Sequence, residues 1–112
     1  MGLIDMYDNR FHAVKAAVIR AGFDEYYQAG WPNKFHRVNI AATSKVLNLQ
    51  YWVCITGGYG PEEHYIAYRA LDNIMAPSKR INCKNQKEMC SVLDSIKAEI
   101  ADAKQAAHKT SQ

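Results

Sequence analysis

The 112-residue sequence predicts an α+β fold: an N-terminal helix, a three- or four-stranded antiparallel sheet, and a long C-terminal amphipathic helix packed on one sheet face. Apolar residues near both ends recur every three or four positions, which is the spacing of an amphipathic helix. Between them, from His36 to Leu71, short runs rich in strand-forming residues alternate between apolar and polar positions. Because a chain of this length has room for one core, we expect a single domain over residues 1–112.

The first helix is predicted from about Asp5 to Ala21. Arg20 in its last turn suits the helix dipole, and Gly22 supplies the left-handed residue that commonly ends a helix. A short helical turn is expected over residues 24–29, because Asp24 is a good cap and the Trp31-Pro32 pair stops a helix. The apolar stripe of the first helix consists of Tyr7, Phe11, Val14, Val18 and Ala21.

The middle of the chain predicts strands at about 36–43 and 48–56, and a short one over residues 80–83. The second of these should be central in the sheet, because both of its faces carry bulky residues. Residues 62–74 fit two structures. Alternation from His64 to Leu71 indicates a strand, whereas Pro61 and two glutamates would start a helix. We favour the strand, as the return arm of a hairpin, and the helix stays open as the alternative.

The C-terminal helix has a clear start. Asn85 and Glu88 have the spacing of a capping box, in which the Asn85 side chain accepts a backbone N–H and Glu88 reaches back. We expect the helix to run to about Ala107 and the last four residues to fray. Its apolar face consists of Met89, Val92, Leu93, Ile96, Ile100 and Ala103.

Composition and charge narrow the class of protein. Hydrophobic residues make up 48% and charged residues 22% of the chain, which is typical of a globular protein. Seven basic and three acidic side chains over residues 33–84 give that region a charge of +4, so an anionic partner would meet the middle of the chain. An odd number of cysteines and no secretory leader predict a reducing, cytoplasmic location, and no apolar run is long enough to span a membrane.

The patterns that would indicate enzymatic chemistry are weak. Gly57–Gly60 follows a strand, as a phosphate-binding loop does, but lacks the Gly-Lys-Ser/Thr ending and precedes two glutamates. Cys54 beside His36 or His64 would make a nucleophilic pair, yet Cys54 lies in the most apolar run, where a thiol is unreactive. Glu62, Glu63 and His64 have acid–base groups but resemble a solvated edge. We therefore expect no enzyme and no cofactor.

Metal binding is also not expected. The five candidate ligands are too widely spaced for a pair two to four residues apart, which zinc sites commonly contain. These ligands are His36, Cys54, His64, Cys83 and Cys90.

Aromatic and basic residues favour binding over chemistry. Seven tyrosines and two tryptophans are more than two helical stripes and one sheet face can easily bury, and tyrosine, tryptophan and arginine dominate interface energies. Four of these rings fall in predicted loops or turns, where they would be exposed: Tyr26, Tyr27, Trp31 and Tyr59. The candidate partner-binding residues are Tyr26, Trp31, Tyr59, Arg69, Lys79 and Arg80.

The functional hypothesis is a small non-enzymatic binding or inhibitory protein that acts through protein–protein contacts. A nucleic-acid-processing complex is one such partner, as for the small accessory proteins of viruses and mobile elements, an analogy of size and style only. An exposed sheet edge offers a second mode, which joins two copies or captures another strand. The alternative is direct nucleic-acid binding, with basic residues on phosphates and unpaired bases stacked on sheet and loop aromatics. The rings considered for this role are Tyr51, Trp52, Tyr59, Tyr65 and Tyr68.

Overall fold

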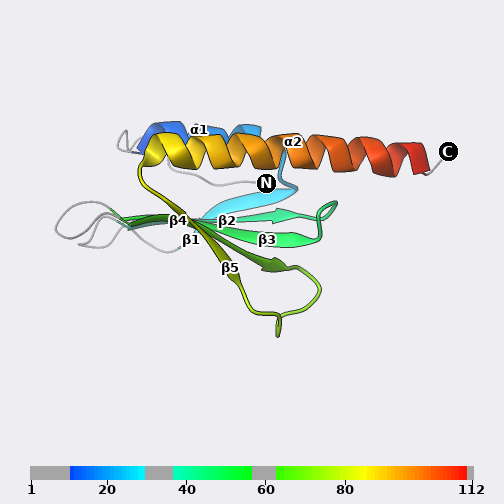
Figure 1. Cartoon of the computed structure of the whole chain (residues 1–112), viewed down its shortest axis with the longest axis horizontal. Coiled ribbons are helices and arrows are strands. Elements are labelled where there is room, and N and C mark those ends of the chain that lie inside the picture. The colour runs from blue at the N-terminus through cyan, green and yellow to red at the C-terminus, as the bar shows by residue number, and fades with distance from the viewer. Residues whose placement is uncertain (1–10, 30–36, 57–62, 111–112) are drawn as a thin grey trace.

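The computed structural model describes residues 11–29, 37–56 and 63–110, which form two helices and one five-stranded antiparallel sheet (Figure 1). The α+β class is therefore confirmed. In chain order the elements are α1 (His12–Arg20), β1 (Glu25–Ala29), β2 (Arg37–Ser44), β3 (Leu49–Thr56), β4 (Glu63–Ala70), β5 (Lys79–Cys83) and α2 (Gln86–Thr110).

The sheet is a meander in which strand order follows chain order, β1-β2-β3-β4-β5, with every neighbouring pair antiparallel. The strand predicted to be central, β3, is central. Residues 63–70 form β4, so the strand interpretation of residues 62–74 is confirmed over that range and the helical alternative is wrong. The short strand at residues 80–83 is also present, as β5.

The sheet has five strands where three or four were predicted, because the expected helical turn at residues 24–29 is strand β1. The predicted cap, Asp24, serves another purpose: its Oδ2 accepts the backbone N–H of Lys45 at 2.7 Å. Tyr26 then lies opposite Ala42 in β2. A helix this short has little intrinsic stability, so pairing with β2 outweighs the local capping signal.

The predicted start and end residues of the two helices are confirmed in part. α1 begins at His12, and the predicted residues 5–10 lie outside the described residues. Gly22 follows the helix with φ of +92°, the left-handed conformation that was expected of it. α2 begins after Asn85, whose Oδ1 accepts the Glu88 N–H at 2.9 Å, which confirms the accepting half of the capping box. α2 continues to Thr110, three residues beyond the predicted end.

Both helices lie on the same side of the sheet (Figure 1). The C-terminal end of α1 is tied to α2 by two contacts. The Arg20 guanidinium forms an exposed ion pair with the Asp94 carboxylate at 3.0 Å, and Lys104 Nζ donates to the Gly22 carbonyl at 3.3 Å. One buried cluster contains residues of both helices and of the sheet: Phe11, Val14, Ala17, Val18, Ala21, Phe23, Ile40, Ala42, Tyr51, Val53, Ile55, Ile66, Met89, Leu93, Ile96 and Ile100.

Candidate binding surface

The sheet face opposite this core, here called the outer face, carries the alternate residues of each strand. Residues directly opposite one another in an antiparallel pair project to the same face. Because Tyr51, Val53 and Ile55 of β3 belong to the core, the intervening residues Trp52 and Cys54 project to the other side. The register then assigns to the outer face Glu25, Tyr27, Asn39, Ala41, Thr43, Gln50, Trp52, Cys54, Tyr65, Ala67, Arg69, Arg80 and Asn82.

One row of the outer face crosses all five strands. It runs Tyr27, Ala41, Trp52, Ala67 and Arg80, so large and small side chains alternate. Two alanines therefore flank Trp52, and Tyr27 at the β1 edge is 54% exposed. The row places an indole at the centre of the sheet and a cation at its β5 edge.

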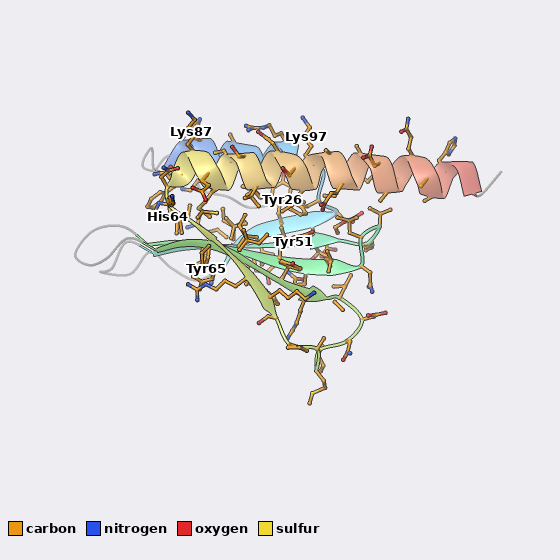
Figure 2. All side chains as sticks on the ribbon, viewed as in Figure 1. Tyr26, Tyr51, His64, Tyr65, Lys87 and Lys97 are labelled. Atoms are coloured by element: carbon orange, nitrogen blue, oxygen red, sulfur yellow. The ribbon has the colours of Figure 1, made fainter. Side chains whose placement is uncertain are left out.

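Arg80 is held by two residues of the neighbouring row, Tyr65 and Asn82. The Cζ atom of Arg80 lies over the Tyr65 ring, 3.6 Å from the ring centroid. Its Nε also donates to Asn82 Oδ1 at 2.9 Å. Figure 2 shows Tyr65 on the side of the sheet away from the helices. The Arg80 guanidinium is therefore held in place by an aromatic ring and an amide.

Arg69 is placed in a similar way. Its Cζ lies over the Trp52 ring, 5.1 Å from the centroid, and its Nη1 donates to the Ile74 carbonyl at 3.3 Å. Beside it, Gln50 is fixed by Thr43, whose hydroxyl donates to Gln50 Oε1 at 2.8 Å. Two arginine–aromatic pairs thus lie on adjacent strands of one surface.

This arrangement suits recognition of carboxylates or phosphates. A guanidinium above an aromatic ring gains a cation–π attraction, and its N–H groups match the geometry of planar or branched anions. Arg69 and Arg80 supply two cations to the β4–β5 side of the outer face, and Glu25 lies on the opposite edge strand, β1.

The predicted partner-binding residues are divided by the structure. Arg69 and Arg80 come together on the outer face, and Lys79 is exposed on β5 but lies opposite Tyr68, toward the core side. Tyr26 is half-buried against the core, so the reasoning that placed it in an exposed turn was wrong (Figure 2). Trp31 and Tyr59 lie outside the described residues.

Two outer-face rings, Trp52 and Tyr65, were missing from the predicted protein contacts, although their alternation with core positions indicates their face. Tyr27 was expected to be exposed in a turn, and it is exposed on strand β1. The aromatic set considered for nucleic acid also needs correction. Tyr51 and Tyr68 point to the core, where their ring centroids are 5.9 Å apart. Trp52 and Tyr65 are the members of that set that the described outer face contains.

The nucleophilic pair of Cys54 with His64 does not form. Cys54 lies on the outer face opposite Tyr65, whereas the adjacent residue His64 projects to the core side, so the sheet separates them. Cys54 is also only 2% exposed. The other candidate partner, His36, lies outside the described residues.

The remaining cysteines are half-buried thiols. Burial raises the pKa of Cys83, with a smaller effect of the Glu88 carboxylate in the same direction. Burial also raises the pKa of Cys90, although nearby Arg20 opposes this effect. Within the described part of the chain, no group of three or more histidine, cysteine or acidic side chains is placed to hold a metal ion.

Neither described helix combines the length and the apolar content needed to cross a lipid bilayer. Comparison of the chain with protein-family models, curated proteins and solved structures gives no match.

Proposed function

We propose that the protein is a small, non-enzymatic binding protein whose outer face occupies an acidic surface of a protein partner. The observation that carries this proposal is the pair of arginines held over Trp52 and Tyr65 on adjacent strands. The proposal takes α2 to cover the opposite face of the sheet, which leaves the outer face for recognition.

The arginines and aromatic rings of the outer face are side chains that suit a protein interface. Arginine and large aromatic residues dominate interface energies because they bury much surface and form several hydrogen bonds. Fixing a long side chain on binding costs conformational entropy, and this cost is smaller when Arg80 is already held by Tyr65 and Asn82. Such a surface would block an acidic site, including one in a nucleic-acid-processing complex, without performing chemistry. We place this activity in a reducing, cytoplasmic setting because the three cysteines are free.

The matched test compares two double variants of the full chain. Arg69→Gln with Arg80→Gln removes two charges from the outer face. Lys87→Gln with Lys97→Gln removes two charges from α2, where Figure 2 shows both lysines pointing away from the sheet. Each tagged protein is used to capture partners from an extract of the native host, with and without nuclease, and bound proteins are identified by mass spectrometry.

We expect nuclease-resistant partners to be recovered by the wild type and by the α2 variant but not by the outer-face variant. Equal recovery by the outer-face variant, with its circular dichroism spectrum unchanged, would show that this surface is not the contact. Loss of all partners after nuclease treatment would favour the second candidate function below.

The second candidate is direct binding of single-stranded nucleic acid. It is favoured by one specific observation: Trp52 and Tyr65 share a sheet face with two arginines. In single-stranded complexes, bases stack on such rings and phosphates pair with such cations. It predicts an affinity for a fluorescent oligonucleotide that falls steeply with salt. An oligonucleotide that fails to bind even at low ionic strength would exclude it.

A further inference from the structure

A groove of about 300 Å³ lies at the end of the sheet where β3 begins and where β4 connects to β5. The groove is on a different part of the molecule from the two rows that contain Trp52 and Tyr65, although Arg69 belongs both to the groove and to the outer face. The lining is mainly apolar, with two cationic side chains: Leu49, Tyr68, Arg69, Ala70, Ala76, Pro77 and Lys79.

The β4–β5 connection carries two large apolar side chains that are exposed. Ile74 is 73% exposed and Met75 is 86% exposed, and both belong to the β4–β5 connection that also supplies Ala76 and Pro77 to the groove wall. The connection is held in shape by hydrogen bonds, because Asn73 Oδ1 accepts the Met75 N–H at 3.1 Å and the Asn73 carbonyl accepts the Ala76 N–H at 3.1 Å. Adjacent exposed apolar groups next to a groove are typical of a protein-binding site.

Charge decides what kind of segment fits. Arg69 and Lys79 line the groove, which has no acidic residue in its lining. A second copy of this chain would bring the same two cations against their equivalents, and like charges at close range oppose association. An acidic segment would instead pair its carboxylates with them.

We propose that this groove binds an extended acidic peptide segment of the protein partner, with one apolar side chain in the groove and carboxylates on Arg69 and Lys79. Ile74 and Met75 would cover the bound side chain from the outside. The inference rests on the proposed function in taking the occupant to be a protein, but it adds a second contact and the chemistry of the segment.

The test uses the isotopically labelled full chain and a defined probe. The probe is a ten-residue peptide that alternates leucine with aspartate, and the control peptide has serine in place of aspartate. Amide chemical shifts locate the binding site, and fluorescence anisotropy of the labelled peptide gives its affinity. The informative variant is Ile74→Ser with Met75→Ser, which changes two exposed side chains, and its matched control is Ile19→Ser at an exposed position of α1.

We expect the acidic peptide to shift the amides of Leu49, Ala70 and Ala76, and the serine peptide to bind more weakly. Loss of one buried apolar contact corresponds to roughly tenfold in affinity, so the double variant should bind at least about tenfold more weakly. The Ile19→Ser control should bind as the wild type does.

Three outcomes would overturn the groove inference. Shifts confined to Trp52 and Tyr65 would move the peptide to the outer face and leave the proposed function intact. A dimer in sedimentation that disappears with Met75→Ser would mean that a second copy fills the groove. No binding of the peptide at millimolar concentration would also reject it, whereas the proposed function is decided separately by capture with the single variant Arg80→Gln, because Arg80 is on the outer face and does not line the groove.

Discussion

Burial of Tyr51 predicts a specific loss of stability at alkaline pH. The ring is 2% exposed, with the centroids of Phe23 and Tyr68 at 5.4 and 5.9 Å. Burial, followed by the nearby Glu99 carboxylate and by Tyr68, raises the pKa of Tyr51 from 10.0 to about 12. The folded protein therefore holds this phenolic proton more tightly than the unfolded chain does.

The sign and size of the effect follow from that difference. Because the pKa is raised on folding, the stabilisation is complete below about pH 10 and is lost as the pH rises toward 12. Between the two pKa values the unfolded chain has lost the Tyr51 proton and the folded protein retains it. In that range each pH unit lowers the free energy of unfolding by about 1.4 kcal/mol. We expect the Tyr51 contribution to fall by about 1 kcal/mol between pH 8 and pH 11, and by about 3 kcal/mol once the pH exceeds 12.

Urea unfolding of the wild type and of Tyr51→Phe at a series of pH values measures this contribution. Phenylalanine cannot ionise, so the variant lacks this part of the alkaline loss, and the difference in unfolding free energy between the two proteins should change by about 1 kcal/mol from pH 8 to pH 11. Tyr27→Phe is the control, because its ring is 54% exposed. Parallel pH profiles for the wild type and Tyr51→Phe would refute the reasoning.

Three further predictions concern the helix cap, the core and the thiols. Asn85→Ala removes the acceptor of the Glu88 N–H and should lower the unfolding free energy by about 1 kcal/mol in urea. Leu93→Ala should cost roughly 2–5 kcal/mol because Leu93 is fully buried, whereas the exposed control Ile74→Ala should change stability by less than about 0.5 kcal/mol. Equal losses would contradict this assignment of the core. Since burial raises the pKa of Cys83 and Cys90, iodoacetamide at pH 8 should modify them more slowly in the folded protein than in urea, and equal rates would argue against the described burial.

The elements that could be predicted from sequence are those with strong local signals. Asn85 and Glu88 mark the start of α2 because a cap is a contact within one turn. β3 and β4 are indicated by the steric preferences and alternation of their residues. β1 could not be predicted, because the local sequence of residues 24–29 favours a capped turn and only pairing with β2 makes it a strand.

The candidate site was predicted less completely than the fold. Arg69 and Arg80 were identified by residue type, but type alone cannot decide between Tyr51 and Trp52, which are adjacent and project to opposite faces. Both faces of β3 carry bulky residues, so the covered face depends on where the helices lie. The groove was also not predictable, since its walls come from the start of β3 and from the distant β4–β5 connection.

The meander has a consequence for how the chain folds. Every strand pairs with its neighbour in sequence, so the sheet grows through short loop closures that cost little chain entropy. The contacts between α1 and α2 are different, since Arg20 and Asp94 are 74 positions apart. Contact between the two helices therefore closes a much longer loop of chain than any pairing of neighbouring strands does. A sheet that has already formed shortens the distance between the helices before they meet. We infer that hairpins are the early events of folding and that the union of the two helices is the late one.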